Sequence, residues 1–392
     1  MATITTQTHN GISLEVSEPL GPMGGVDNQL GGFVGTANIV TANNNGEAVK
    51  YGEPVKIRTL ADLALLDKSA KLSAVLYNSV KYFLEVAQVP CYVILCPEGA
   101  NEAETLENVI GGVSTEGRLT GIHAFKACPE APTNIAAPGF YGKEEDTELA
   151  IPNALAGVAN QTYCEAWLDA PQGGTKKAKA FAARLGGDQK RVWCCDVNGE
   201  RWDHAIPASV IGMAARCSVK PSQTPNGAST PLDDISRIVG YRVNDKNSEG
   251  VELNKAGVSV TIRDPNGGLM FLGTRTADGS FGNIIGIENQ LCRELIKSHR
   301  DTMKYNLDFD FFKQRIAQLS NWLSSLQADG EIIGARCYLH ETRNNLQRYK
   351  NGEWVLVIDW GAYRPNEHSI IELNQDDELL KVYVDDAIKT FG

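Results

Sequence analysis

The sequence predicts a multi-domain protein that combines α/β and α+β folds, and three observations lead to this fold class. The chain has 392 residues, enough for two or three domains. Hydrophobic residues make up 42% of it, so a large core can form. Between residues 32 and 195 short apolar runs alternate with segments of helical spacing, whereas the last third groups its predicted helices together and its strands together.

The first α/β segment begins with a short apolar run at residues 32–37, which predicts a buried strand. Apolar residues at helical spacing predict helices over residues 60–66 and 72–86. A second buried strand is expected at residues 92–95. Strands that alternate with helices need right-handed crossovers, which favours a partly parallel sheet.

A second α/β segment begins near Gly111 and contains a predicted helix over residues 175–185. Its predicted strands cover residues 135–138, 166–168 and 191–195. Side chains alternate along a strand, so Cys194 and Cys195 are expected on opposite faces of the sheet. A vicinal disulfide or redox site is therefore not predicted there.

The last third follows a loop-rich excursion at residues 220–256, which we interpret as a domain boundary. The turn sequence Asp264-Pro265-Asn266-Gly267-Gly268 predicts a β-hairpin. Two helices and two strands should follow. The hairpin strands cover residues 258–262 and 269–272, the helices residues 284–303 and 312–326, and the later strands residues 331–339 and 354–360.

Near both chain ends, apolar and polar residues alternate. Residues that interrupt regular secondary structure separate these two segments from the rest of the chain. Pro and Gly at residues 19–25 follow the first alternating run, and the pair Asp376-Asp377 precedes the second, at residues 380–384. A lone strand is not stable by itself, so each predicted terminal strand must pair elsewhere. The residues expected to face a receiving sheet are Ile12, Leu14, Val16, Val382 and Val384.

Charge and cysteine content limit the class of protein. The net charge of −11 argues against binding to nucleic acid or to an anionic membrane. Nine cysteines, an odd number without CxxC spacing, indicate a reduced folding compartment. The N-terminus lacks the basic and apolar regions of a signal peptide, and no apolar run approaches roughly 18 residues. We expect a soluble protein made in a cytoplasm.

The sequence predicts no catalytic, cofactor or metal site. Its six histidines form no pair at metal-ligand spacing, and the HExxH, GxSxG and P-loop motifs do not occur. Residues 245–250 are similar to the first half of a calcium loop, but Ala256 stands where a bidentate glutamate is needed. Asp308 and Asp310 precede a helix, where capping explains them better than metal binding.

Seven short stretches of the sequence occur in an order that is typical of one protein family. They are GISLE at residues 11–15, FVGTA at 33–37, LADL at 60–63, GRLTGI at 117–122, AAPG at 136–139, GTRT at 273–276 and PNE at 365–367. In this order and spacing the chain resembles the single-chain tail sheath proteins of contractile phages and R-type pyocins. It departs from the family at Leu272, where a tryptophan is usual, and only loosely matches the family's loop at residues 221–226.

The resemblance implies a division of the chain into assembly arms and domains. An inner C-terminal α+β domain is completed by terminal strands, and α/β domains lie outside it. The implied parts are an N-terminal arm at residues 1–22, an outer α/β subdomain at 23–108, a middle α/β domain at 109–256, the inner domain at 257–373 and a C-terminal arm at 374–392.

The resemblance also implies function and partners. The chain would form a helical homo-oligomer around a tail tube protein, contact baseplate and terminator proteins, and contract to drive the tube through a target cell envelope. It would be assembled in the bacterial cytoplasm as part of a virion tail or a tailocin-like particle, with neither nucleic acid nor membrane insertion. No cofactor and no second sheath chain are implied.

The inner domain is expected to face the tube with a cationic helix. Residues 283–350 hold ten Lys or Arg and eight Asp or Glu, a balance of +2 against −11 for the whole chain. Lys297, Arg300 and Lys304 recur at helical spacing and are the candidate tube contacts. Leu291, Leu295 and Met303 are expected on another face. A merely solvated cationic face is the alternative.

Two other functions remain open from the sequence. A tube or baseplate protein would share the composition, although tube proteins are shorter. An α/β enzyme with an unrecognised site would show a ligand-sized pocket with acids of perturbed pKa at its strand ends.

Overall fold

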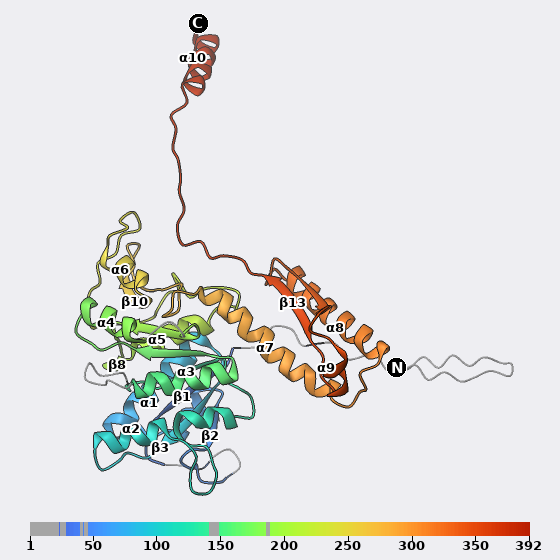
Figure 1. Ribbon diagram of the computed structural model, residues 1–392. Coiled ribbons are helices and arrows are strands. Elements are labelled where there is room, and N and C mark those ends of the chain that lie inside the picture. The colour runs from blue at the N-terminus through green and yellow to red at the C-terminus, as the bar shows by residue number, and fades with distance from the viewer. Residues whose placement is uncertain (1–22, 24–28, 40–41, 43–45, 141–148, 186–188) are drawn as a thin grey trace, which may run out of the picture.

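The computed structural model describes residues 23, 29–39, 42, 46–140, 149–185 and 189–392. The predicted N-terminal strand with Ile12, Leu14 and Val16 lies outside the described residues. The described chain forms an α/β body (residues 29–272), a C-terminal body (residues 282–361) and a tail (residues 362–391) (Figure 1).

The α/β body is organised around one eight-stranded sheet with the order β11-β10-β6-β5-β4-β1-β3-β2. The six strands from β10 to β3 are parallel, and β11 and β2 close the two edges in antiparallel pairs. The strands are β1 (Gly31–Thr36), β2 (Pro54–Ile57), β3 (Cys91–Cys96), β4 (Asn134–Ala136), β5 (Glu165–Asp169), β6 (Val192–Asp196), β10 (Val258–Arg263) and β11 (Leu269–Leu272).

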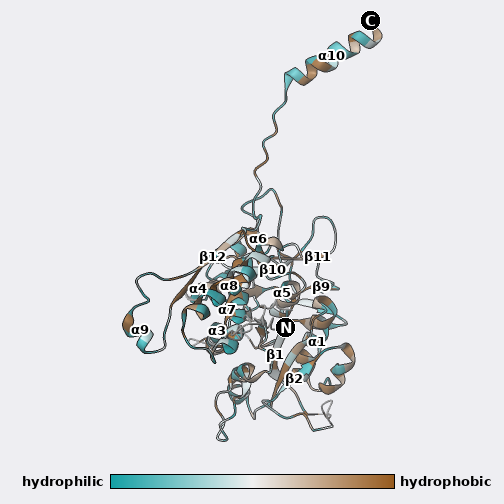
Figure 2. Ribbon diagram, turned by 90° about the vertical axis from the view of Figure 1, so that its right-hand side faces the viewer, coloured by the Kyte–Doolittle hydropathy of each residue, from teal (hydrophilic) through white to brown (hydrophobic). Residues whose placement is uncertain are grey.

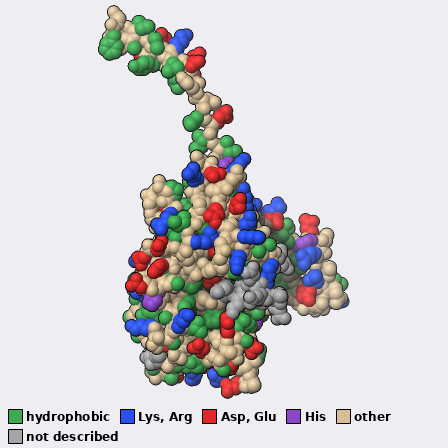
Figure 3. Space-filling model, turned by 90° about the vertical axis from the view of Figure 1, so that its left-hand side faces the viewer, with side chains coloured by type: hydrophobic (Ala, Val, Ile, Leu, Met, Phe, Trp, Pro, Cys, Tyr) green, Lys and Arg blue, Asp and Glu red, His purple; other side chains and the backbone are tan. Residues whose placement is uncertain are grey.

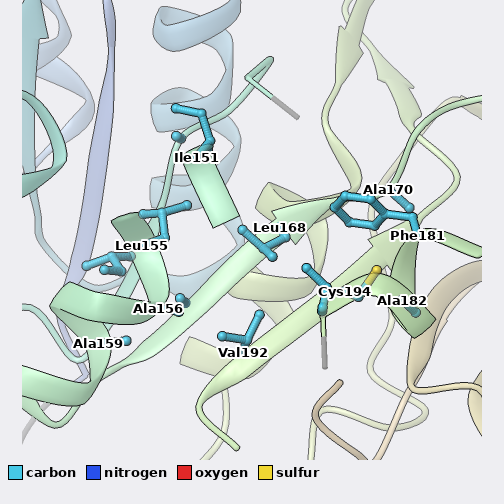
Figure 4. Close-up of a cluster of buried hydrophobic side chains, with 14 of the residues drawn as sticks. Ile151, Leu155, Ala156, Ala159, Leu168, Ala170, Phe181, Ala182, Val192 and Cys194 are labelled. Atoms are coloured by element: carbon cyan, nitrogen blue, oxygen red, sulfur yellow. The ribbon is translucent and has the colours of Figure 1, made fainter. Parts of the chain in front are cut away.

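Helices cover both faces of this sheet and bury two separate cores. One core lies under α1 (Lys71–Ala87) and α5 (Ala208–Cys217). The other lies under α2 (Glu102–Ile110), α3 (Ala150–Thr162), α4 (Thr175–Leu185) and α6 (Glu249–Lys255), and Figure 4 shows part of it between α3, α4 and strands β5 and β6. Cys194 lies in this second core and Cys195 in the first, which confirms their opposite orientation.

Short elements complete the α/β body. Two 3₁₀ helices lie in loops, and a small sheet has the order β8-β7-β9. These elements are η1 (Leu60–Leu65), η2 (Gly121–Ala127), β7 (Gly199–Arg201), β8 (His204–Ile206) and β9 (Asp234–Ile235).

The C-terminal body packs two long helices against a two-stranded sheet. Its core contains Leu291, Leu319 and Trp322, and Met23, near the start of the described chain, packs against it. Asp308 caps the second helix by accepting a hydrogen bond from the Phe311 amide at 2.7 Å, as the sequence predicts. The elements are α7 (Gly282–Thr302), α8 (Phe309–Ala328), β12 (Gly334–Leu339), α9 (Leu346–Lys350) and β13 (Leu356–Gly361).

The single sheet runs across two boundaries expected from the sequence. Strands β1 to β3 precede residue 109, β4 to β6 follow it, and β10 and β11 follow residue 256, yet all pair in one sheet. The outer and middle domains expected at residues 23–108 and 109–256 therefore share one sheet with residues 258–272. Strand pairing between distant segments thus joins the parts that the resemblance divides at residues 109 and 257.

The tail differs from its prediction. Residues 362–376 have no regular structure, and residues 377–391 form the helix α10 (Asp377–Phe391) in place of the strand expected at residues 380–384. Leu380 and Val384 are four residues apart, and this separation fits both a strand and a helix. The apolar residues Ala387, Ile388 and Phe391 follow at helical spacing, so the longer pattern favours a helix over a strand.

A buried ion pair holds the α/β body together where α7 begins. Arg216 of α5 and Glu165 of β5 are both buried, with Nη2 of the arginine 2.9 Å from Oε1 of the glutamate. Arg216 also donates to the backbone carbonyls of Lys220, Pro221 and Gln223 at 3.0–3.1 Å. The Trp193 indole N–H donates to the same carboxylate.

Two glycines allow α7 to pack closely against the cluster of Arg216, Glu165 and Trp193. Gly282 and Gly286 are one helical turn apart, and a Cβ atom at Gly282 would lie 2.1 Å from the Trp193 ring. A Cβ atom at Gly286 would lie 2.1 Å from Nη2 of Arg216 and 2.5 Å from the carbonyl oxygen of Pro221. The first turns of α7 therefore approach the α/β body more closely than any side chain would permit.

We expect Gly286→Ala to lower the free energy of unfolding by about 1–3 kcal/mol, the usual cost of overpacking, despite the better helix propensity of alanine. Urea denaturation measures this. Gly157→Ala in α3 is the matched control, because a Cβ atom there meets nothing within 4 Å. Equal stability of the two variants would show that α7 is not held by this close approach.

Candidate functional site

The C-terminal body exposes the two edges of its sheet. Strands β12 and β13 pair antiparallel from Gly334 with Gly361 to Leu339 with Leu356, and no third strand joins them within the described ranges. An open edge presents unpaired backbone N–H and C=O groups to any strand that reaches it. The sheet is therefore a site where another segment can add by main-chain hydrogen bonds.

One face of this small sheet is fixed by α8. Trp322 and Leu323 of α8 lie in the same core that Cys337 and Ile358 of the strands pack against. Across the sheet, Nε of Arg336 lies 2.7 Å from Oδ2 of Asp359. A two-stranded sheet alone is marginally stable, so the helix supplies the support that keeps the edges in a fixed position.

An apolar groove of about 490 Å³ lies beside this sheet. Residues of α7, α8, β13 and the segment just before β13 line it, and among the described residues the ionisable groups of its lining are His299 and Arg315. Arg315 donates from Nη2 to the Ser298 hydroxyl at 2.9 Å, and burial lowers its pKa. The lining residues are Leu295, Ile296, His299, Arg315, Leu319, Trp354, Leu356 and Ile358.

The three predicted tube-contact residues are all exposed at the far end of α7. Lys297 is 72% exposed and lies 3.7 Å from the carboxylate of Glu294. Arg300 is in the last turn, whereas Lys304 follows the end of the helix, and its Nζ lies 5.2 Å from the centre of the Tyr305 ring. The structure brings them to one end of the C-terminal body. Whether they contact a tube stays a prediction.

The apolar face expected for this helix is partly wrong. Leu291 is buried and Leu295 packs against the core, but Met303 is 73% exposed. Met303 lies just beyond Thr302, where α7 ends, so helical spacing no longer places it on the buried face.

The tail exposes apolar side chains that no described residue covers. Ile370, Ile371 and Leu373 are exposed in its extended part, and no residue of α10 is buried in the described structure. Figure 2 shows hydrophobic and hydrophilic residues along α10, and Figure 3 shows hydrophobic side chains at its surface. Val382 and Val384, predicted as strand residues, are both in this helix.

The strand ends of the large sheet hold acids that serve the fold. Asp169 ends β5, and its carboxylate accepts hydrogen bonds from the Ser209 amide at 2.6 Å and the Ser209 hydroxyl at 2.9 Å. Burial raises the pKa of Asp169 to about 6. Because Ser209 is in the first turn of α5, this carboxylate fixes the start of that helix.

Asp196 at the end of β6 is likewise engaged. Its Oδ2 lies 2.5 Å from Nη2 of Arg237, and Nη1 of Arg237 lies 2.8 Å from Glu249. Within the described ranges no three His, Cys, Asp or Glu residues are grouped as metal ligands, and no helix is long and apolar enough to cross a membrane. The strand-end acids thus join elements of the fold to each other.

Sequence reasoning missed the groove, the ion pair and helix α10. The spacing of Leu380, Val384, Ala387 and Phe391 could have revealed α10. The groove and the pairing of Glu165 with Arg216 depend on segments far apart in the chain and left no local signal.

Comparison with known proteins gives relatives along nearly the whole chain. No family model matches it. The chain is 21% identical to the tail sheath protein of Escherichia phage P2, over 95% of this chain and 96% of that protein. It is also 21% identical to the tail sheath protein of Burkholderia phage BcepMu, over 70% of this chain and 63% of that protein.

Solved structures share the fold. A chain in the cryo-EM structure of the anti-feeding prophage helical sheath in contracted state matches with a TM-score of 0.70 at 17% identity, over 95% of this chain and 100% of that chain. A chain in the contracted PVC sheath complex, an extracellular contractile injection system, matches with a TM-score of 0.66 at 16% identity, over 96% and 99%. The mixed α and β fold class and the resemblance to contractile tail sheath proteins are confirmed.

Asp169 gives a pH dependence that can be measured. Its pKa is higher in the folded chain, about 6, than its ordinary value of 3.8, so its ionisation opposes folding. The stability that it contributes is complete below about pH 4 and is lost as the pH rises through 6. Relative to Asp169→Asn, the native chain should lose on the order of 3 kcal/mol between these limits.

Urea denaturation of both proteins from pH 4 to pH 7 measures the difference. Asp67→Asn is the control, because hydrogen bonds from Ser69 lower the pKa of Asp67, and the stability that this carboxyl contributes changes only below its ordinary pKa of 3.8. The pH profile of that variant should therefore stay nearly parallel to that of the native chain over this range. Parallel pH profiles of the native chain and Asp169→Asn would show that Asp169 is not the buried acid described.

Proposed function

We propose that this protein is the sheath subunit of a contractile tail. It polymerises as a helical homo-oligomer around a tail tube and contracts to drive the tube through a target cell envelope. The observation that supports this most is the open-edged sheet of β12 and β13 in a chain that also has an extended, uncovered tail. Its similarity to sheath proteins over 95% of its length agrees with this assignment.

Strand exchange explains why the edges and the tail occur together. An exposed edge invites aggregation unless a designated strand covers it. In a strand, this part of the tail would place Ile371 and Leu373 on one side and Ile370 on the other, a pattern suited to pairing. We assign the C-terminal exchanged strand to residues 369–373. The sequence predicts this strand around Val382 and Val384, but both valines are in α10. The N-terminal strand with Ile12, Leu14 and Val16 would supply the second arm.

Contraction on this proposal is a rearrangement of rigid bodies. Main-chain hydrogen bonds between exchanged strands survive when the linkers bend, so neighbours stay attached while the lattice changes. Each subunit contacts mainly its lattice neighbours, so a change at one end propagates along the polymer. The energy lies in the difference between two lattices, and the chain needs no enzymatic activity, which agrees with the structural roles of Asp169 and Asp196.

The partners follow from the same assignment. Lys297, Arg300 and Lys304 face the tube protein, and the ends of the polymer meet baseplate and terminator proteins. A structure of the anti-feeding prophage baseplate contains a chain that matches this one with a TM-score of 0.70. Assembly takes place in the bacterial cytoplasm, and the product is a phage tail or a tailocin-like particle.

The purified chain should form tubes or rings as its concentration rises, and negative-stain electron microscopy will show them. Deletion of residues 1–18 should leave a folded, soluble monomer that does not assemble, because the arm is lost and the described bodies are not. A native chain that stays monomeric at high concentration contradicts the sheath assignment. A deletion that unfolds the protein would instead place the strand in its own core.

Replacing Lys297, Arg300 and Lys304 with Glu should abolish decoration of a tail tube while self-polymerisation persists. Exposed charge pairs contribute about 0.2–1 kcal/mol each, and many subunits multiply the effect. Tube decoration is scored by electron microscopy at several salt concentrations, since salt should weaken the native contact.

The matched control for this charge reversal replaces Lys68, Lys71 and Lys176, which are exposed on the α/β body, with Glu. It changes the net charge equally and should leave decoration intact. Normal decoration by the first variant would exclude this end of α7 from the tube contact.

A further inference from the structure

We propose that α10 of one subunit docks in the apolar groove between α7, α8 and β13 of a second copy. This inference rests on the proposed self-assembly and adds a helix-in-groove contact to the exchanged strand. It gives the groove one occupant, the C-terminal helix of a neighbouring chain.

Helix α10 has the pattern of a docking helix. Leu380, Tyr383, Val384, Ala387, Ile388 and Phe391 recur at i, i+3, i+4, i+7, i+8 and i+11, which forms one continuous apolar stripe. Val382 falls on the opposite side, with Glu378, Asp385 and Lys389. A 15-residue helix is marginal in water by itself, so its apolar stripe needs a partner surface.

The groove offers the surface that this stripe needs. Leucine, isoleucine and tryptophan side chains make most of its lining, and Ile296 at its wall is 59% exposed. Amphipathic helices bind grooves of this kind through anchors one turn apart. The volume of about 490 Å³ is room for such anchors.

Charge favours α10 as the occupant. The helix has four acidic residues, Asp377, Glu378, Asp385 and Asp386, and two lysines, Lys381 and Lys389, a balance of −2. The lining of the groove includes Arg315 and His299 and, among the described residues, no acidic side chain.

The course of the tail favours a second copy. Tyr363 accepts a hydrogen bond from Asn283 at 2.9 Å, and Glu367 pairs with Arg275 at 2.7 Å. Both contacts hold the tail at the start of α7, whereas the groove lies at residues 295–299, further along that helix. The tail then extends away from its own C-terminal body (Figure 1). A strand added beside a neighbour's β12 or β13 would carry α10 to the groove of that same neighbour.

The first test uses a fluorescent peptide of residues 374–392 and the full chain below its polymerisation threshold. Anisotropy should show binding that weakens about tenfold or more in a peptide with Val384→Asp, the effect of losing a central apolar anchor. The matched control peptide carries Val382→Asp, since the two valines are 51% and 57% exposed and differ mainly in face. Ile296→Asp in the full chain should weaken binding similarly without harming the fold.

Equal binding of the Val384→Asp and Val382→Asp peptides, or no binding of the native peptide, would overturn the inference. A photo-cross-linker at position 384 then identifies the groove that is used. A cross-linked dimer joined to residues of α7 or α8 supports a second copy, and a cross-link within one chain overturns it. If the peptide binds but the native chain never forms tubes, the proposed function fails and the docking contact stands.

Discussion

The buried ion pair of Glu165 and Arg216 is the constraint on which the arrangement of the chain depends. Two charges removed from water destabilise a fold unless they are paired and fully hydrogen-bonded, and removing one partner typically costs about 3–5 kcal/mol. Here the guanidinium reaches the carboxylate and three backbone carbonyls, and the Trp193 indole completes the set. The pair therefore fixes β5, α5, β6 and the loop at residues 220–223 relative to each other.

Helix α7 connects this rigid cluster to the C-terminal body. Its first turns rest on the ion-pair cluster through Gly282 and Gly286, and its later turns form the core and the groove of the C-terminal body. Arg191 adds a further contact to the start of α7, because its Nη2 lies 2.6 Å from Oε1 of Glu288 in that helix. One continuous helix thus belongs to both bodies, so the orientation of the open sheet edges is set by contacts inside the α/β body.

Much of the fold could be predicted from the sequence, because local patterns record which residues are buried. The helix at residues 175–185 and the strands around Val93 and Trp193 have clear periods or apolar runs. Helix α5 has no such signal, since all ten of its residues are buried and it lacks a polar face. The candidate site was harder to predict. The groove is lined by residues from 295 to 358 that are far apart in the sequence. The apolar spacing in the tail fits both a strand and a helix.

The short spacing between the two apolar parts of the tail affects how such a lattice would grow. Three residues, 374–376, separate the exposed run at residues 370–373 from α10, and they span at most about 10 Å. Once the first part is bound, the second is confined near its target at an effective concentration in the millimolar range. On the proposed contacts, a subunit held at one point would dissociate quickly and one held at both would stay, so wrongly placed subunits would leave before the lattice closes over them.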